Sequence, residues 1–248
     1  MAYSPQFQNR TVIFEDWGHA DYKTAWDRQK QYQQQIVAQK VANRKRPPLE
    51  HVPTDNYLVF NQHPHVFTLG KSGDEANLLL SEAEMAAAGI QYYHIERGGD
   101  ITYHGPGQLT GYPIFDLENF RTDLGSYLRN IEQAIINVLA SYGIKGDRIE
   151  KLTGVWVDTQ TPNPRKICAI GIKCSRWVSM HGFAFNITTD LSYFNKIVPC
   201  GIADKGVTSL AAELGEAVDF NRVADEVKIA LSEVFGYRYA HEGQFKPV

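Results

Sequence analysis

The chain has 248 residues, 43% of them hydrophobic and 12% aromatic, and a formal net charge of −3 at pH 7. This length is enough for one domain with a sizeable core, and the small net charge, without a basic block interleaved with aromatics, argues against nucleic acid as a partner. The first residues lack the apolar core of a signal peptide, and no stretch of about 18 apolar residues is present to cross a membrane. We therefore expect a globular cytoplasmic protein that binds neither nucleic acid nor membrane.

The first half of the sequence predicts a long helix followed by two strands. Aromatic and aliphatic residues recur at helical spacing over 22–41, and Pro47 and Pro48 follow, so we predict an amphipathic helix with a glutamine-rich exposed face. The runs 57–60 (YLVF) and 66–69 (VFTL) have the β-branched and aromatic residues typical of strands. Because only a short proline-containing turn separates them, we expect these strands to form a hairpin or nearly so.

The second half predicts two helices with strands between them. Apolar residues repeat at i, i+3, i+4 and i+7 over 124–142, with Asp123 placed to cap the start of that helix and Gly143 to end it. A further helix is expected over 221–235. In the last of the intervening strands apolar residues alternate with small or polar ones, the pattern of a half-buried strand. The predicted strands are 155–157, 167–172 and 183–187.

The domain organisation follows from this order of elements. Helices and strands mix without the regular βαβ rhythm of a Rossmann fold or a barrel, and neither an internal repeat nor a low-complexity linker divides the chain. We therefore predict a single α+β domain that spans residues 1–248.

A glycine-rich segment, RGGDITYHGPGQLTGYP from Arg97 to Pro113, holds five glycines and two prolines. Glycine lets the backbone approach a ligand closely and proline fixes the intervening geometry, so we predict a shaped wall of a binding site. Arg97 and His104 would give this wall its polar groups. Residue type alone leaves open whether His104 shapes the wall or exchanges protons.

Cys200 is the candidate nucleophile. A free cysteine is by default a small buried hydrophobe, but Cys200 lies between Pro199 and Gly201, which stiffen the approach and leave room beside the sulfur for a substrate carbonyl. Lys166 is either an ordinary solvated strand end or an ammonium group that favours the thiolate of Cys200, which thioester exchange requires. The residues alone leave both roles of Lys166 open.

The other cysteines and histidines predict no further chemistry. Cys168 and Cys174 lie in or beside an apolar strand, and three cysteines without CxxC spacing argue against disulfides and structural zinc. His63 and His65 flank a proline but have no matching ligand cluster, so we expect no metal site.

A slot for a linear chain is predicted between two strands. Gly182 and Ala184 put small residues on one strand, and Ala169, Ile170 and Gly171 lie on a neighbour. Burial of a linear acyl chain there contributes about 0.8 kcal/mol per CH₂, enough to select its length.

The segments 97–108 (RGGDITYHGPGQ), 165–172 (RKICAIGI), 181–186 (HGFAFN) and 197–202 (IVPCGI) together resemble the octanoyltransferases of the lipoate pathway, the lipoate-protein ligase B family. The resemblance extends from about residue 57 to 214. It implies the fold of biotin and lipoate protein ligases, a mixed, largely antiparallel sheet flanked by helices. It also implies transfer of an octanoyl group from octanoyl-acyl carrier protein to a lysine of lipoyl domains, through a thioester and without metal or cofactor.

The resemblance also implies the acceptors and the site residues. The acceptors would be the lipoyl domains of 2-oxoacid dehydrogenase acyltransferase subunits and the glycine cleavage H protein. The catalytic residues would be Cys200, Lys166 and His104. The residues that bind the substrate would be Arg97, Gly98, Gly99, Asp100, Ile101, Thr102, Tyr103, His104, Ala169, Ile170, Gly171, Gly182, Phe183 and Ala184.

Three other activities stay open from the sequence: an ATP-dependent lipoate ligase of the same fold, a cysteine hydrolase, and a non-catalytic module that binds lipoyl domains or acyl carriers. The ligase is disfavoured because 105–108 (GPGQ) stands where such ligases usually carry an Asp-x-Gly-Asn run. The basic stretch Arg44-Lys45-Arg46 is either a solvated helix end or a docking site for an acidic carrier.

Overall fold

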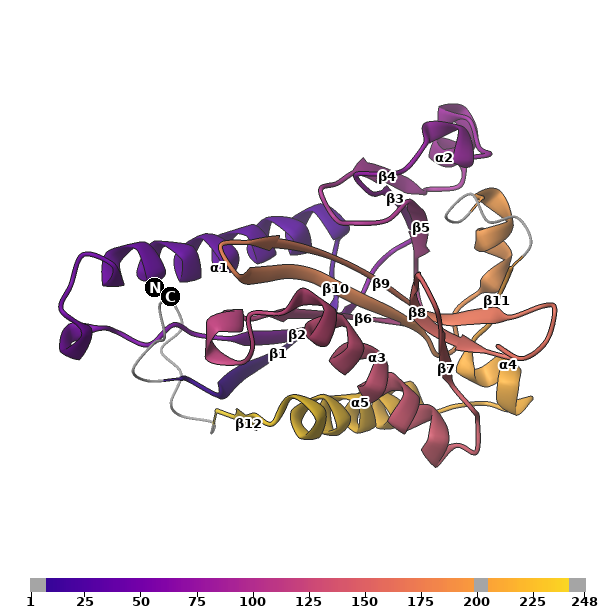
Figure 1. Cartoon of the computed structure of the whole chain (residues 1–248). Coiled ribbons are helices and arrows are strands. Elements are labelled where there is room, and N and C mark those ends of the chain that lie inside the picture. The colour runs from indigo at the N-terminus through magenta and orange to yellow at the C-terminus, as the bar shows by residue number, and fades with distance from the viewer. Residues whose placement is uncertain (1–7, 199–204, 241–248) are drawn as a thin grey trace.

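The computed structural model describes residues 8–198 and 205–240. Within them, a large mixed sheet has the strand order β12-β1-β2-β6-β10-β9-β8-β7, with β11 also paired to β9 (Figure 1). The β12–β1, β1–β2 and β11–β9 pairs are parallel and the others antiparallel. The strands are β1 (Thr11–His19), β2 (Tyr57–Gln62), β6 (Gln108–Ile114), β7 (Asp147–Ile149), β8 (Leu152–Val157), β9 (Arg165–Ser175), β10 (Val178–Asn186), β11 (Gly206–Val207) and β12 (Arg238–Tyr239).

A second sheet of three strands, β4-β3-β5, lies at one end of the large sheet (Figure 1). Its strands are β3 (Val66–Leu69), β4 (Gln91–His94) and β5 (Ile101–His104). The predicted hairpin is therefore wrong: β2 and β3 exist as expected but belong to different sheets, because β1 and β6 occupy both edges of β2. The turn between them is anchored by the buried His63, whose Nδ1 pairs with the carbonyl oxygen of Ala20 at 2.8 Å and whose Nε2 pairs with the Tyr112 hydroxyl at 2.5 Å.

Helix α1 (Tyr22–Asn43) crosses one face of the large sheet, above β10 in Figure 1. Its predicted glutamine-rich exposed face is only half right, because Gln29 and Gln33 are buried against the sheet. The Gln29 Oε1 accepts a hydrogen bond from the backbone N–H of His181 at 3.1 Å, and the Gln33 Nε2 donates to the carbonyl of Val178 at 2.9 Å. These amides satisfy backbone groups on the α1 side of β10, which an apolar helix face would leave unpaired.

The opposite face of the large sheet is covered by α3 (Leu124–Ser141) and α5 (Phe220–Phe235), which pack together over the main core. Both helices confirm the predictions over 124–142 and 221–235, and the side chain of Asp123 caps α3 by accepting from the N–H of Ser126 at 2.9 Å. Because helices cover both faces, every residue of β10 is buried, so the half-buried strand predicted there is wrong. The remaining helical elements are α2 (Glu82–Ala87), α4 (Leu210–Leu214) and the 3₁₀ turns Pro48–Glu50, Glu75–Asn77, Leu117–Asn119 and Leu191–Lys196.

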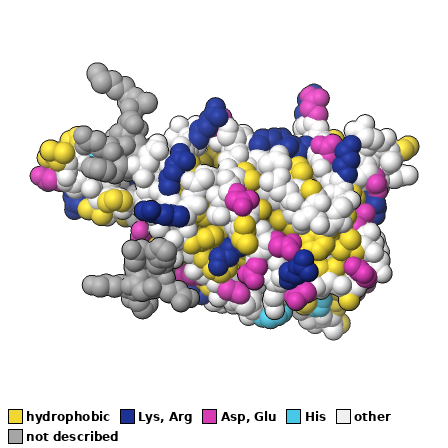
Figure 2. Space-filling view, turned by 90° about the horizontal axis from the view of Figure 1, so that it is seen from below, with side chains coloured by type: hydrophobic (Ala, Val, Ile, Leu, Met, Phe, Trp, Pro, Cys, Tyr) yellow, Lys and Arg dark blue, Asp and Glu magenta, His cyan; other side chains and the backbone are white. Residues whose placement is uncertain are grey.

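The surface seen from below carries intermixed positive and negative side chains without a dominant sign (Figure 2). This mixture agrees with the formal net charge of −3. Across residues 8–198 and 205–240, no helix combines the length and the apolar character needed to cross a bilayer.

Candidate active site

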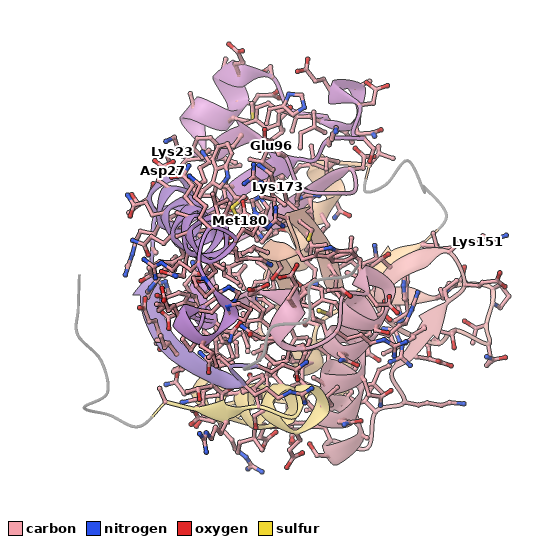
Figure 3. The ribbon with its side chains drawn as sticks, turned by 60° about the vertical axis from the view of Figure 1, so that its left-hand side comes forward. Lys23, Asp27, Glu96, Lys151, Lys173 and Met180 are labelled. Atoms are coloured by element: carbon pink, nitrogen blue, oxygen red, sulfur yellow. The ribbon has the colours of Figure 1, made fainter. Side chains whose placement is uncertain are left out.

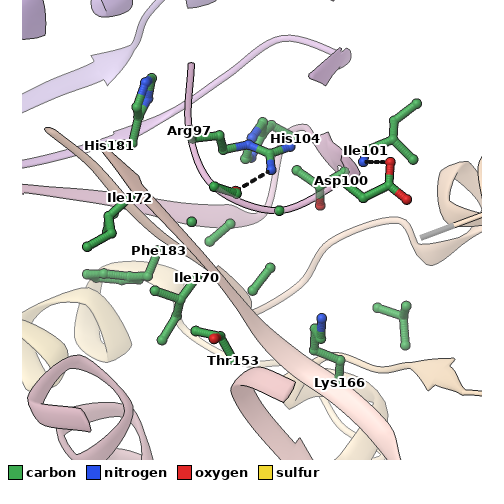
Figure 4. Close-up of a pocket in the computed structure, with 18 of the residues that line it drawn as sticks. Arg97, Asp100, Ile101, His104, Thr153, Lys166, Ile170, Ile172, His181 and Phe183 are labelled. Carbon is green, nitrogen blue, oxygen red and sulfur yellow. Dashed lines mark hydrogen bonds between the residues drawn. The ribbon is translucent and has the colours of Figure 1, made fainter. Parts of the chain in front are cut away.

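A cavity of about 340 Å³ lies between the glycine-rich loop and strands β8, β9 and β10 (Figure 4). Its volume falls within the range of small-molecule sites, roughly 300 to 1,000 Å³. Glycines and apolar side chains form much of the lining, and Arg97, His104 and Lys166 contribute polar groups to it. Such a lining suits an apolar ligand with a polar reacting end.

The structure brings nearly all the predicted substrate-binding residues to this cavity, with the exception of Tyr103. Strand β5 alternates its side chains, so Thr102 and His104 face the cavity and Tyr103 points to the other side. There the Tyr103 hydroxyl meets Nδ1 of His65 at 2.7 Å, and its ring stacks on Tyr193 with centroids 4.8 Å apart. Of the predicted catalytic residues, Lys166 and His104 line the cavity and Cys200 lies outside the described residues.

Small residues occupy facing positions on β9 and β10. Gly171 pairs with Gly182, and Ala169 pairs with Ala184. Ile170, Ile172 and Phe183 project from the same strands on the side away from Arg97, toward the main core (Figure 4). Small residues of both strands therefore line the cavity, and their use as a slot for an acyl chain stays a prediction.

The glycine-rich loop is held directly against β9. The N–H of Gly98 donates to the carbonyl of Ile172 at 2.9 Å, and Glu96 forms an ion pair with Lys173 (Figure 3). A Cβ at position 171 would lie 3.0 Å from the Cδ of Arg97 and 2.9 Å from the carbonyl oxygen of Gly98. Glycine at 171 therefore permits the close approach of loop and strand.

Arg97 and Asp100 fix the shape of this loop. The Nη2 of Arg97 donates to the carbonyl and the hydroxyl of Thr68 at 2.7 and 3.0 Å, and its Nη1 donates to the carbonyl of Gly98 at 3.1 Å. The Asp100 carboxylate accepts from the N–H of Ile101 at 2.7 Å and from the Asn77 amide at 2.6 Å. Two of these bonds are drawn in Figure 4, and together they make the loop a rigid wall.

His104 is almost completely buried in this wall. Its Nδ1 lies 2.8 Å from the Oε1 of Gln108, its Nε2 lies 3.4 Å from the Thr68 hydroxyl, and its ring stacks on Tyr22 with centroids 5.8 Å apart. Burial, followed by the nearby His63, lowers the pKa of His104 well below its ordinary value. The imidazole is therefore neutral near pH 7.

Lys166 lies at the opposite end of the cavity from His181 (Figure 4). It is the second residue of β9, and its Nζ is 4.6 Å from the centroid of the Trp156 ring on β8, a favourable cation–π distance. Strand β11 pairs beside it, Val207 with Lys166, so the chain that follows residues 199–204 returns to this end of the cavity.

The two described cysteines, Cys168 and Cys174, carry free thiols. Burial raises the pKa of both, and Cys168 is fully enclosed in the main core. A thiol that stays protonated is a poor nucleophile, which agrees with the structural role predicted for them.

Sequence reasoning missed many of the lining residues, among them Tyr22, Tyr112, Thr153 and Trp156. These four come from α1, β6 and β8, and no local motif marks them because only the tertiary fold brings these elements to the cavity. The basic stretch 44–46 follows the far end of α1, roughly 30 Å along the helix from Tyr22 at about 1.5 Å per residue.

The chain matches known proteins along most of its length. Residues 21–232 match the family described as the lipoyl protein ligase A/B catalytic domain. A protein of Flavobacterium johnsoniae named octanoyltransferase is 54% identical over 228 residues, which are 92% of this chain and 97% of that protein. An octanoyltransferase of Cytophaga hutchinsonii is likewise 54% identical, over 92% of this chain and 93% of its own length.

Solved structures share the fold at much lower identity. A bi-partite lipoate protein ligase from Thermoplasma acidophilum has a TM-score of 0.63 at 15% identity and covers 95% of this chain and 89% of its own. A lipoate-protein ligase A bound with ATP has a TM-score of 0.62 at 16% identity, over 94% of this chain and 87% of its own. These likenesses confirm the predicted α+β fold. The family match and the relatives above establish that the chain belongs to the lipoyl protein ligase A/B catalytic-domain family, among its octanoyltransferases, and is an acyltransferase of lipoyl or octanoyl transfer.

Proposed function

We propose that this enzyme takes an octanoyl group from octanoyl-acyl carrier protein and passes it to a lysine of lipoyl domains, through a thioester on Cys200. The observation that carries the proposal is the slot of small residues on β9 and β10, which leads toward Lys166. An eight-carbon chain fits such an apolar slot, and its burial contributes several kcal/mol at about 0.8 kcal/mol per CH₂. The relatives named octanoyltransferase support the same assignment.

In the first step the Cys200 thiolate attacks the carbonyl carbon of the donor thioester. The tetrahedral intermediate collapses, the bond to the pantetheine sulfur breaks, and the departing thiolate takes a proton from the Lys166 ammonium. An octanoyl-enzyme with a neutral Lys166 amine results. Because the acyl group arrives as a thioester, it is already activated for this transfer.

In the second step the neutral Lys166 accepts a proton from the ε-ammonium of the acceptor lysine, whose reference pKa is about 10.4. The freed amine attacks the thioester carbonyl, an amide bond forms, and Cys200 leaves as a thiolate. The second proton of the attacking nitrogen passes to solvent, and Lys166 is again an ammonium. The acceptors are the lipoyl domains of 2-oxoacid dehydrogenase acyltransferase subunits and of the glycine cleavage H protein.

The proposal is tested by intact mass spectrometry after brief exposure to octanoyl-acyl carrier protein without ATP, followed by an apo lipoyl domain. We expect one octanoyl adduct on the wild type and on Cys174→Ser, its transfer to the domain, and no adduct on Cys200→Ser. Cys174→Ser is the matched control because it removes a different free thiol. Modification of the domain only with ATP and free octanoic acid would instead identify a ligase, and release of free octanoate without transfer would identify a hydrolase.

A further inference from the structure

A continuous chain of hydrogen bonds joins the glycine-rich wall to the backbone beside Lys166. His104 Nδ1 lies 2.8 Å from the Gln108 Oε1, and the Gln108 Nε2 donates to the Asn186 Oδ1 at 2.9 Å and to the Tyr103 carbonyl at 3.1 Å. The Asn186 Nδ2 donates to the carbonyl of Thr208 at 3.0 Å. The three side chains, of His104, Gln108 and Asn186, come from β5, β6 and β10, and those of Gln108 and Asn186 are almost inaccessible to solvent.

The direction of the chain is set at the end where its partners can only accept. The carbonyls of Tyr103 and Thr208 accept hydrogen bonds and cannot donate, which orients the amides of Gln108 and Asn186. The Gln108 Oε1 therefore faces His104 and requires a proton on its Nδ1. In the neutral ring Nε2 is then an acceptor, so the Thr68 hydroxyl, which also accepts from Arg97 at 3.0 Å, is the donor in the 3.4 Å contact, the longest step.

The same bonds reach the backbone of Lys166. The N–H of Thr208 donates to the carbonyl of Lys166 at 2.9 Å, directly after the β11–β9 pair. The Asn186 amide holds the carbonyl of that same Thr208. The walls that carry His104 and Lys166 are thus joined through two buried amides.

We propose that Gln108 and Asn186 are positioning residues, which lock His104 as the neutral, Nδ1-protonated tautomer and tie the glycine-rich wall to the strand that carries Lys166. His104 then braces the site and does not exchange protons with the substrate, since both ring nitrogens are already engaged. The fixed tautomer of His104 does not depend on the proposed octanoyl transfer, but its effect on kcat rests on that function.

The charged and titratable groups around His104 also favour its neutral form. His63 on the turn after β2 has its ring centroid 5.9 Å away, Arg97 lies on the adjoining loop, and His181 lies on β10; each lowers the pKa of His104. Tyr22 of α1 stacks on the ring, and burial raises the pKa of its hydroxyl, so it stays neutral too. Within the described residues that contact His104, none offers it a negative charge.

The first test reads the tautomer directly from the two-bond ¹⁵N–¹H spectrum of histidine-labelled wild type between pH 5 and 8, with no substrate present. We expect one signal set with the proton on Nδ1 and no titration in this range. It is assigned by its loss in His104→Asn, or by elimination with His63→Gln and His181→Asn if that variant does not fold. An Nε2–H tautomer, or an imidazolium forming near pH 6.5, would overturn the proposal.

The second test separates bracing from proton exchange in the octanoyl transfer. In His104→Asn an amide N–H can replace Nδ1–H as the donor to Gln108 but cannot exchange protons at neutral pH, whereas His104→Leu keeps the size and loses the donor. We expect His104→Asn to keep at least about a tenth of the wild-type kcat with an unchanged pH profile, and His104→Leu to lose about 100-fold, as a misplaced site does. Equal losses of kcat in His104→Asn and His104→Leu, with one limb of the pH profile missing in both, would show proton exchange instead.

Variants of the two amides complete the test. Asn186→Asp and Gln108→Leu should lower kcat by about tenfold or more with little change in the KM for the acyl donor, because the apolar slot is intact. Gln33→Leu is the control: it removes an equally buried amide that donates to the carbonyl of Val178 and does not line the cavity, so it should cost stability and keep kcat. Equal kcat losses in all three variants would mean general destabilisation. If the wild type transfers no octanoyl group at all, the proposed function fails. The histidine spectrum then still tests whether His104 is held as the Nδ1-protonated tautomer.

Discussion

The Lys166 ammonium, 4.6 Å from the Trp156 ring centroid, and the neutral, enclosed imidazole of His104 lie in contrasting surroundings within one cavity. A cation on an aromatic face keeps its charge, and a charge near a thiol favours the thiolate. An imidazole whose two nitrogens already have hydrogen-bond partners is suited to shaping the cavity wall. These surroundings support the different roles that we propose for the two residues.

A first prediction concerns Lys166→Met. Loss of the ammonium should raise the pKa of the Cys200 thiol toward its ordinary value of about 8.5, by a unit or more, because in the proposed mechanism the Lys166 charge favours the thiolate. The midpoint of the pH dependence of iodoacetamide alkylation, measured in a Cys174→Ser background, should move to higher pH by that amount. Lys145→Met, at an exposed lysine after α3, is the control, and an identical midpoint in both variants would contradict the role given to Lys166.

At the scale of elements, β9 and β10 supply a large part of the cavity lining. Their facing small residues form the slot, and the loop that closes it is held by a backbone bond to Ile172 and by the Glu96–Lys173 ion pair. The site is thus made of regular strands with one rigid loop laid across them. The length of the acyl chain that the enzyme prefers should therefore depend on how far the slot extends along these strands.

The second prediction is a chain-length profile. In the wild type, kcat/KM for acyl transfer should fall about fourfold for each methylene removed from the octanoyl chain, the equivalent of about 0.8 kcal/mol. Ala169→Leu should fill the slot, lowering octanoyl transfer by at least about tenfold and butyryl transfer much less. The exposed Ala86→Leu on α2 should leave the profile unchanged. A wild-type profile without length dependence would exclude the slot as the acyl site.

The third prediction concerns the basic stretch 44–46, which is exposed beyond the end of α1 and far from the cavity. Reversal of its three charges to glutamate should leave the KM for the acyl carrier and its dependence on salt unchanged, because a carrier bound there would hold its arm too far from the slot. Steady-state kinetics at low and high salt measure both. A KM raised several-fold at low salt only would restore this stretch as a docking site.

Much of the element pattern was predictable because it is local. The helical spacing over α3, the Asp123 cap and the strand composition of β2 and β3 each depend on a few neighbouring residues. Which elements face each other is not local. The burial of Gln29, the separation of β2 from β3 and the approach of Tyr22 to the cavity depend on partners far away in the sequence, so spacing alone predicted them wrongly or not at all.

At the scale of the whole molecule, buried neutral histidines connect the site to acid stability. Burial lowers the pKa of His63 to about 4 and that of His181 to about 3, and it lowers that of His104 as well. In the unfolded chain these groups titrate near 6.5, so between about pH 6.5 and 4 the unfolded state binds more protons than the folded state. Stability present above pH 6.5 is therefore lost as the pH falls through this window.

The fourth prediction concerns this loss of stability at low pH. The free energy of unfolding in urea should fall steadily from pH 7 to pH 4, and His63 alone should account for at most about 3 kcal/mol of the loss. A His63→Asn variant that still folds should show a shallower slope, while the exposed His94→Gln should keep the wild-type slope. A stability that does not change across this range would mean that these histidines are not buried in neutral form.

The parallel pairing of β1 with β12 has a consequence for how the protein is made. Thr11 and Val12 find their partners in Arg238 and Tyr239, at the other extreme of the described chain. Because β1 is synthesised long before β12, the outer edge of β1 stays unpaired until the ribosome has passed residue 239. A nascent chain in this state is open to pairing with its neighbours on a polysome until β12, the last strand of the described residues, closes the edge.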